Sequence, residues 1–523
     1  MNFLRDLPVL VLGLGDSGLA MARWCARCGA NVTVWDSREA APSDAALAAE
    51  LPAVTRWRGE LSPTHLIGMQ LVLKSPGLGP NDARVAPLLN EARDIGVAVL
   101  GELDLFVRAL ADLKQVQGYA PQLLAITGTN GKTTTTAMTA LLVARAGKRV
   151  VTAGNIGPTL LDTLTAQLDA PADAEGQPAT MPEVWVLELS SFQLDTVRGF
   201  EPAAATVLNI TQDHLDWHGN MTAYTAAKAR VFGQHAVMVV NRDDEAVEAM
   251  VPVPVVTKVK PKVADRPAPR EVIRFGLDAP RRPGDFGLVV ENGMAWLVRA
   301  LPADETFKRK KDEEVEIHLQ RLMPADALRV RGRHNAANAL AALALATAIG
   351  CALAPMLHGL RDYAGEPHRV AFVARLSRGS GDVEAFDDSK GTNVGATVAA
   401  LNGLGADKAP GRLVVILGGD GKGQDFTPLR EPLSRHARAV ATIGRDAAAI
   451  EVALLGGIGL VPMQRHDSLQ DAVAWCFEQA EAGDAVLLSP ACASLDMFRN
   501  YAHRAEVFAA AVQALAAEHG ALA

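Results

Sequence analysis

The chain has 523 residues, 49% of them hydrophobic and 21% charged, which is enough for about three globular domains. Its formal net charge of −8 implies no basic face, which argues against a general nucleic-acid-binding protein. Five cysteines in so long a chain indicate a reducing compartment, and the first residues lack the layout of a signal peptide, so we expect a cytoplasmic protein.

The first strand-rich block predicts a nucleotide-binding fold. An apolar run at residues 9–12 leads into glycines spaced as GxGxxG over 13–18, and a helix is expected over 19–28. A second strand over 31–35 ends at Asp36, where a dinucleotide-type site carries its acidic residue. The pattern indicates a nucleotide-like ligand. The alternative is a Rossmann-like domain whose glycines serve only tight packing.

A phosphate-binding loop is predicted at the start of the second block. A buried strand is expected at 123–126 and a helix from Ala137, with the Gly-rich segment 126–134 between them. In such a loop backbone N–H groups hold anionic oxygens, Lys132 reaches the terminal phosphates, and the Thr133 hydroxyl can face Mg²⁺. The full Walker pattern has one more glycine than this segment, and the alternative is an ordinary Gly-rich turn. We expect a nucleoside triphosphate as ligand.

Four further apolar runs with polar ends predict parallel strands whose C-terminal ends form a site. They lie at 150–157, 184–191, 205–209 and 237–241. Three segments rich in Ala, Pro and Asp or in Lys and Arg are predicted to be surface insertions, near 169–182, 257–271 and 302–314.

Four polar residues at or after these strands are candidates for the site. Glu188 stands at a strand end, where a carboxylate can hold Mg²⁺ through oxygen ligands, although a solvated glutamate is the alternative. Asp213 and His214 add a carboxylate and an imidazole near the same sheet edge, but histidine is an unusual Mg²⁺ ligand. Spacing alone predicts that Lys228 is a surface lysine on a helix.

The third block starts near Glu366 and is predicted to be another doubly wound unit, with strands at 412–417, 439–443 and 485–488. The Ala- and Leu-rich stretch 336–360 is interrupted by polar residues and predicts a buried helix, so no membrane insertion is expected. The predicted fold class is α/β with three domains. These are a Rossmann-like N-terminal domain, a central P-loop-type ATPase domain with a mostly parallel sheet, and a Rossmann-like C-terminal domain.

An ordered series of motifs from Gly13 to Tyr501 resembles the Mur ligase family of peptidoglycan synthesis. The motifs lie at 126–133, 154–157, 187–193, 213–214, 333–335, 367–369, 388–393, 419–422 and 488–494. Within the family, residues 190–193, 388–393 and 489–494 most resemble the ligases that add D-glutamate.

The resemblance implies an ATP site with two Mg²⁺ ions. The implied ATP-binding residues are Gly128, Thr129, Asn130, Gly131, Lys132, Thr133, Thr134, Asn335, Arg369 and Asp388. Thr133 and Glu188 are implied ligands of one Mg²⁺, and His214 and Lys228 of the other. The family's matching lysine is carbamylated, which turns an ammonium into a carboxylate-like ligand. Lys132, Lys228, His214 and Lys390 are the implied catalytic residues, with Lys390 expected to neutralise charge at the reaction centre.

Two small-molecule substrates are implied, UDP-N-acetylmuramoyl-L-alanine and D-glutamate. The uridine diphosphate site matches Asp16, Ser17, Asp36, Ser37, Arg38, Ser75, Pro76 and Gly77. Asn155 is expected to contact the muramoyl part, and Ser190 is also expected to bind substrate. The D-glutamate pocket matches Thr392, Lys422, Ser494, Leu495 and Tyr501. Ser37 replaces the family's commoner threonine and keeps its hydroxyl. Tyr501 stands where phenylalanine is more usual, which leaves that contact in doubt.

Each domain is then expected to bring one substrate. The UDP-substrate domain spans 1–101, the ATP-binding domain 102–365, and the domain that binds D-glutamate and adds to the ATP site 366–523. The implied reaction is an ATP-driven amide ligation through an acyl phosphate, which needs Mg²⁺ and lysines against crowded phosphate charge. We expect a monomer that binds no nucleic acid.

Two rival functions fit parts of the sequence. Another ligase of the family, including the folylpolyglutamate synthases, shares the central motifs, but Asp36, Ser37 and Arg38 favour a UDP substrate. A P-loop regulatory protein that only senses ATP would not require the Lys422 and Ser494 pair.

Overall fold

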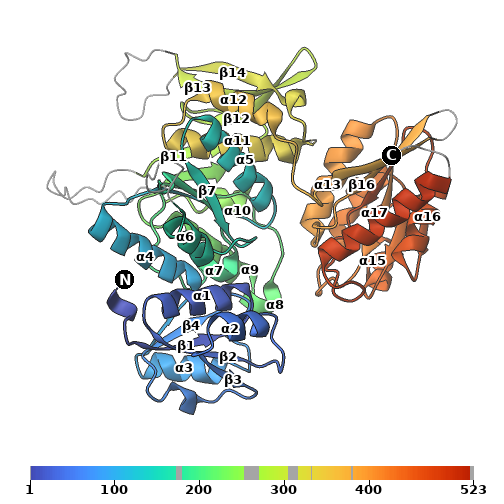
Figure 1. Cartoon of the computed structure of the whole chain (residues 1–523). Helices are drawn as coiled ribbons and strands as arrows, with labels where there is room; N and C mark the ends of the chain where they lie inside the picture. The colour runs from blue at the N-terminus through green and yellow to red at the C-terminus, as the bar shows by residue number, and fades with distance from the viewer. Residues whose placement is uncertain are drawn as a thin grey trace, which may run out of the picture.

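The computed structural model describes residues 2–171, 180–252, 270–303, 316–330, 332–377 and 381–518. The three expected surface insertions fall for the most part outside these residues. The described chain forms three groups of elements in sequence order, blue, green to yellow, and orange to red in Figure 1. No helix of the described residues has the length and apolar character needed to cross a membrane.

The N-terminal elements form a five-stranded parallel sheet in the order β3-β2-β1-β4-β5, flanked by α-helices, and the expected strand–turn–helix–strand unit is confirmed. A Cβ on Gly18 would lie 1.9 Å from the Gly13 carbonyl oxygen, so the last glycine of the GxGxxG turn lets helix α1 approach strand β1. The elements are β1 Pro8–Leu12, α1 Asp16–Arg27, β2 Asn31–Asp36, α2 Asp44–Glu50, β3 Thr55–Arg58, β4 Leu71–Lys74, α3 Ala86–Asp94 and β5 Ala98–Leu100.

The central elements begin with α4 (Glu102–Gln117) and form a six-stranded parallel sheet in the order β11-β10-β9-β6-β8-β7. Its strands are β6 Gln122–Thr127, β7 Val150–Gly154, β8 Val184–Glu188, β9 Ala204–Val207, β10 Val237–Asn241 and β11 Val272–Phe275. Its helices are α5 Lys132–Arg145, α6 Leu160–Leu168, α7 Ser191–Leu194, α8 Leu215–His218, α9 Met221–Ala229, α10 Glu245–Glu248, α11 Arg333–Ala348 and α12 Leu353–Asp362. The expected strands are confirmed, and helix α5 begins at Lys132, before the expected Ala137.

A three-stranded antiparallel sheet, which the sequence analysis did not predict, adjoins the central sheet. Its strands are β12 Phe286–Glu291, β13 Met294–Pro302 and β14 Ile317–Pro324. The single helix expected over 336–360 is two helices, α11 and α12, because the chain turns at Gly350, whose φ is +79°. Helix α11 is buried along most of its length and packs its alanines against the central core, as its composition predicts.

The C-terminal elements form a six-stranded sheet in the order β15-β16-β20-β17-β18-β19, in which only β15 is antiparallel to its neighbour. Its strands are β15 Ala371–Ser377, β16 Asp382–Asp387, β17 Leu413–Gly418, β18 Ala437–Ile443, β19 Met463–Arg465 and β20 Ala485–Leu488. Its helices are α13 Val394–Lys408, α14 Arg430–His436, α15 Ala447–Leu454, α16 Leu469–Gln479 and α17 Tyr501–Glu518. Short 3₁₀ helices span Asn2–Leu4, Pro63–Leu66, Arg230–Phe232, Ala325–Ala327 and Thr427–Leu429.

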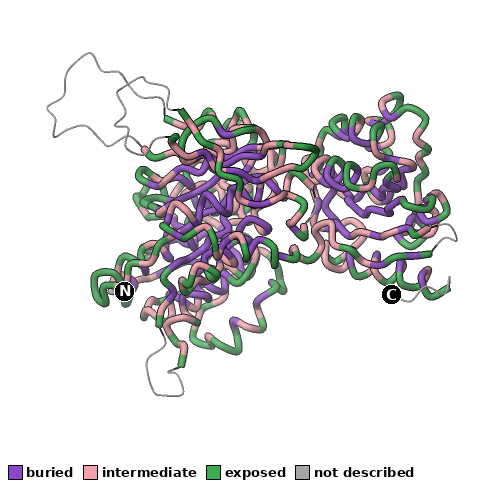
Figure 2. Tube along the Cα trace, turned by 90° about the horizontal axis from the view of Figure 1, so that it is seen from above, coloured by how far each residue is buried: buried purple, intermediate pink, exposed green. Residues whose placement is uncertain are grey.

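The N-terminal and C-terminal groups differ in how they pack against the central group. One apolar cluster contains residues of both the N-terminal and the central elements, such as Trp24 and Leu161, so these two share a core. The two clusters of the C-terminal elements consist, among the described residues, only of residues from Val370 onward. In Figure 2 the buried interior of the C-terminal elements is separate from that of the N-terminal and central elements. The site described next lies where these groups meet.

Candidate active site

The phosphate loop connects β6 to α5 and is held by the end of the neighbouring strand β9. Asn209 accepts from the Asn130 N–H at 2.8 Å and donates its amide to the Asn130 carbonyl at 3.0 Å. Gly128 and Gly131 have φ values of +149° and +84°, which L side chains rarely adopt. A Cβ on Gly128 would also lie 2.9 Å from Leu208 Cβ, so this turn requires glycine there.

Lys132 is the first residue of α5 and folds back over this loop. Its Nζ donates to the carbonyl oxygens of Gly128 and Thr129, each at 2.9 Å. Burial lowers the pKa of Lys132, and the carboxylates of Glu188 and Asp213 oppose that shift. The lysine therefore places a cation beside a glycine turn at a helix N-terminus, which is an arrangement suited to bind phosphate.

Lys228 is not a surface lysine, and the prediction from spacing alone is wrong. The residue is 2% exposed, and its Nζ donates to the Gly128 carbonyl at 2.8 Å, with the Tyr224 ring centroid 4.8 Å away. Ala227 and Lys228 follow Tyr224 by three and four residues, about one helical turn, so all three lie on one face of α9, and this face is buried. Burial lowers the pKa of Lys228 well below its ordinary value, and the Lys132 ammonium adds to the effect.

Glu188 and His214 lie near these two lysines. Glu188 is the last residue of β8 and pairs with Ile126 of β6. It is 3% exposed, and its carboxylate accepts a hydrogen bond from the Asn155 side chain at 3.0 Å. His214 has a φ of +53°, and its ring packs on Phe192 with centroids 4.6 Å apart. Burial lowers the pKa of His214. Asp213, 3.5 Å from its Nε2, opposes this, and the cations of Lys422, Lys132 and Lys228 add to it.

The donors at this edge suit Mg²⁺ only in part. Thr133 offers a hydroxyl and Glu188 a carboxylate, which are the hard oxygen ligands that Mg²⁺ takes together with phosphate oxygens and water. Among the described residues no group of three or more His, Cys, Asp and Glu side chains is placed to hold a metal ion unaided. Beside His214, the Lys228 amine supplies no oxygen, so that pair fits the ion only after carbamylation.

Residues of the C-terminal part meet the phosphate loop directly. Arg369 donates to the Thr133 hydroxyl at 2.8 Å, and the side-chain amides of Asn130 and Asn393 exchange hydrogen bonds of 3.0 and 3.2 Å. Asp388 accepts from Ser489 at 2.7 Å, and burial raises its pKa to about 7. A cavity of about 80 Å³ lies here, lined in part by Asn130, Gly131, Thr134, Asn335, Arg369, Asp388 and Lys390.

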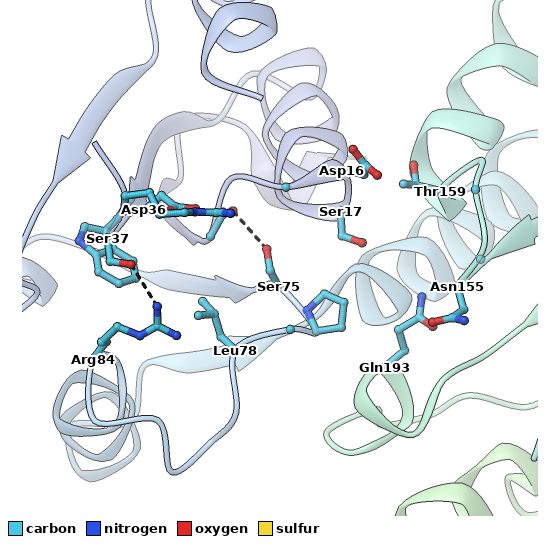
Figure 3. Close-up of a pocket in the computed structure, with 18 residues that line it drawn as sticks. Asp16, Ser17, Asp36, Ser37, Ser75, Leu78, Arg84, Asn155, Thr159 and Gln193 are labelled. Carbon is cyan, nitrogen blue, oxygen red and sulfur yellow. Dashed lines mark hydrogen bonds and ion pairs between the residues drawn. The ribbon is translucent and has the colours of Figure 1, made fainter. Parts of the chain in front are cut away.

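A larger cavity of about 470 Å³ opens between the N-terminal and central sheets (Figure 3). All the residues expected to bind uridine diphosphate line it, together with Asn155. Burial opposes ionisation of Asp36, but hydrogen bonds from Arg38 and the Leu14 N–H outweigh it and lower the pKa of this carboxyl. Ser190 instead caps α7 and bonds to Gln193, which itself lines the cavity.

The sequence analysis missed several residues of this cavity, among them Trp35, Leu78, Arg84, Thr159 and Gln193. Arg84 reaches across to the Ser37 hydroxyl at 3.2 Å, as Figure 3 shows. Gln193 carried a signal, because the predicted Ser190 stands three positions before it in a capping-box spacing. Arg84 lies before α3 without such a pattern.

Four of the five residues expected around D-glutamate lie on loops of the C-terminal part, and Tyr501 begins a helix. Strands β17 and β20 pair, and an isolated bridge between Asp420 and Ala493 holds together the loops that carry Lys422 and Ser494. Ser494 is buried and Leu495 is 73% exposed. The first residue of α17 is Tyr501, whose ring centroid lies 5.1 Å from Lys390 Nζ. Thr392 follows Lys390, and its N–H donates to the Lys390 carbonyl.

Arg504 is a further residue that the sequence analysis missed. It is buried on α17 and donates to the Ser389 carbonyl at 2.8 Å and to the Cys492 carbonyl at 3.1 Å. Burial lowers its pKa to about 10. The guanidinium thus ties the loop of Asp388 and Lys390 to the loop of Ser494.

Comparison with known proteins covers nearly the whole chain. Residues 8–101 match the family model "Mur ligase MurD-like, N-terminal domain", residues 126–274 match "Mur ligase middle domain" and residues 368–492 match "Mur ligase, glutamate ligase domain". A UDP-N-acetylmuramoylalanine--D-glutamate ligase of Albidiferax ferrireducens is 61% identical over 523 residues, which cover 100% of this chain and 99% of the relative. One from Burkholderia pseudomallei is 55% identical over 527 residues, covering 99% of each chain.

Solved structures share the fold at lower identity. The UDP-N-acetylmuramate-alanine ligase MurC of Thermotoga maritima is 19% identical, with a TM-score of 0.53 over 97% of this chain and 99% of its own. The MurF ligase of Thermotoga maritima, solved in complex with ADP, is 15% identical, with a TM-score of 0.54 over 98% and 96%. At these identities the likeness concerns the fold alone, and it confirms the predicted three-domain α/β class.

Proposed function

The chain belongs to the Mur ligase family, and from this premise we propose that it joins D-glutamate to UDP-N-acetylmuramoyl-L-alanine with ATP, in peptidoglycan precursor synthesis. The observation that carries the proposal is the 61% identity, over the full length, to a ligase of that name. The site supports it, because the phosphate loop bonds to Arg369 and Asn393 of the C-terminal part. Asn155, which lines the larger cavity, bonds to Glu188 at the end of β8.

The reaction proceeds in two steps. The substrate carboxylate attacks the γ-phosphate of ATP, giving an acyl phosphate and ADP. The amine of D-glutamate then attacks the acyl carbon, and inorganic phosphate leaves from the tetrahedral intermediate. Three cations at the phosphate loop would neutralise the charge that gathers on the transferring phosphate, and preorganised cations of this kind stabilise such transition states. They are Lys132, Arg369 and Lys390.

Two Mg²⁺ ions complete the proposed site and neutralise phosphate charge when bound. Thr133 and Glu188 would hold one with the phosphates, and His214 and a carbamylated Lys228 the other. Burial favours the neutral amine of Lys228, the form that can add carbon dioxide, and the nearby Lys132 cation favours the resulting anion.

Each substrate is assigned to one part of the chain. Residues 1–101 hold the uridine diphosphate, residues 102–365 hold ATP, and residues 366–523 hold D-glutamate and close the ATP site. We propose that the protein acts as a monomer in the cytoplasm, where its nucleotide substrates are found.

Phosphate release tests the function. With ATP, Mg²⁺ and UDP-N-acetylmuramoyl-L-alanine, D-glutamate should support release, whereas L-glutamate should be a poor substrate. Inverting the α-carbon prevents both carboxylates and the amine from reaching their partners together. The measurement is a panel of D- and L-amino acids, with the UDP substrate omitted as control. Faster release with a different amino acid would assign another ligase of the family, and none with any amino acid would favour an ATP sensor.

The third domain is expected to set the choice of amino acid. Lys422 and Ser494 should hold the carboxylates of D-glutamate through charge-assisted hydrogen bonds, each worth roughly 1.5–3 kcal/mol. Lys422→Ala or Ser494→Ala should therefore raise KM for D-glutamate by about tenfold or more, and that for ATP far less. Steady-state kinetics with each substrate varied in turn give the measurement. Equal rises in all three KM values would indicate a general structural role instead.

A further inference from the structure

Lys74 ends strand β4 directly before the loop 75–79, part of which lines the larger cavity. Its side chain is 5% exposed, and its Nζ donates to the Leu78 carbonyl at 2.7 Å, which closes this loop on itself. The ammonium also lies 5.3 Å from the ring centroid of Trp217. Burial lowers the pKa of Lys74 to about 8, and the Asp195 carboxylate opposes that shift.

Trp217 belongs to α8, which Figure 1 draws at the boundary between the N-terminal and central elements. The same loop touches it a second time, because a Cβ on Gly79 would lie 3.4 Å from the indole Cδ1 and Nε1. The indole N–H is buried and has no hydrogen-bond partner among the described residues, so packing and the Lys74 cation hold the ring. One tryptophan of the central domain thus contacts both ends of an N-terminal loop.

From Trp217 a chain of rings leads to the reaction centre. The indole packs on Phe192 with centroids 4.9 Å apart, and Phe192 packs on His214 at 4.6 Å. His218 adds a contact of 4.4 Å to Trp217 and bonds to the Ser191 hydroxyl. Phe192 belongs to α7, the short helix that also presents Gln193 to the cavity.

The wall of the cavity that helix α1 forms is attached to the central elements by different contacts. Helix α1 shares an apolar core with the central elements, and Arg23 pairs with Asp162 of α6 at 3.2 Å. Leu78 packs instead against a cluster made of N-terminal residues. The contact with Trp217 therefore attaches the loop 75–79 to the central elements independently of the contacts made by α1.

We propose that Lys74 and Trp217 form a latch that fixes the loop 75–79 relative to His214, so that a substrate held by its uridine diphosphate presents its far end to the phosphate loop. The proposal rests on the proposed function, because it assigns these two as positioning residues for the UDP substrate. Neither side chain needs to touch the reacting atoms. A substrate that spans two domains keeps its contacts at both ends only when the domains are held at the right separation, so misplacement weakens binding of the whole substrate but not of UDP alone.

Kinetics of latch variants test this. Trp217→Ala and Lys74→Met should each raise KM for UDP-N-acetylmuramoyl-L-alanine by about tenfold, the order of a desolvated cation–π contact, and leave KM for ATP within about twofold. Lys74→Met alters only the N-terminal side of the contact, so this variant alone tests the latch if Trp217→Ala does not fold. Lys74→Arg and Trp217→Phe, which keep the cation or the ring, should recover most of the loss.

A matched control and a second readout separate a latch from a general loss of packing. Trp296→Ala removes a half-buried tryptophan from β13, away from this loop, and should change no KM. Equilibrium binding of UDP alone should be unchanged in Trp217→Ala, since that variant keeps the bond from Lys74 to Leu78. An unchanged KM for the UDP substrate in both latch variants, or an equal rise for ATP, overturns the latch. If the wild-type protein does not turn over this substrate at all, it is the proposed function that fails.

Discussion

Lys132→Ala is expected to lower ATP-dependent turnover on the order of 10²-fold or more, the cost of removing one preorganised charge from a transition state. The ammonium lies inside the phosphate loop, bonded to two of its carbonyl oxygens, and phosphate oxygens would replace these as partners. Arg369 meets the loop at the Thr133 hydroxyl and Lys390 lines the neighbouring cavity, so neither cation occupies the place of Lys132 beside the carbonyls of Gly128 and Thr129. The loss should appear in the rate of phosphate release.

The fold should survive this substitution. Asn209 holds the loop through the backbone of Asn130, and that pair of bonds does not involve Lys132. Lys114→Ala, which changes an exposed lysine on α4, is the matched control and should keep full activity. Near-normal turnover of a Lys132→Ala protein with an unchanged melting temperature would contradict the phosphate-loop assignment.

The parallel sheets were predictable because their strands are buried on both faces and therefore appear as short apolar runs. Polar residues at the ends of those runs, such as Glu188 at the end of β8, mark the edge where the site lies. The antiparallel sheet of β12, β13 and β14 escaped prediction because its strands are only partly buried. Its signal was Asn292-Gly293, a two-residue hairpin turn with both φ values positive.

Contacts between side chains from distant parts of the sequence were harder to predict than the order of the strands. The burial of Lys228 follows from its position one turn after Tyr224 on α9, and a lysine on an inward face does not show its partners in the sequence. The contacts of Trp217 with Lys74 and Gly79 join residues more than a hundred positions apart. No local period encodes such a contact, because it depends on how two domains are placed.

Lys228→Ala is expected to lose most activity and to regain part of it when formate or acetate is added. The side chain is buried beside Lys132, where a neutral amine offers neither an anion to that cation nor an oxygen to a metal ion. A carbamate supplies both. If that anion is the only contribution of the residue, a small carboxylate that enters the space left by truncation should imitate it.

The pattern of rescue distinguishes this explanation from others. Formate should raise phosphate release by Lys228→Ala in a saturable manner, whereas sodium chloride at the same ionic strength should not. Lys132→Ala is the matched control, because that variant lacks a cation and an added anion cannot replace it. Full activity of Lys228→Ala without additive would mean that the buried lysine is structural. A loss that no carboxylate restores would mean that its amine, rather than a carbamate, serves the reaction through the bond to the Gly128 carbonyl.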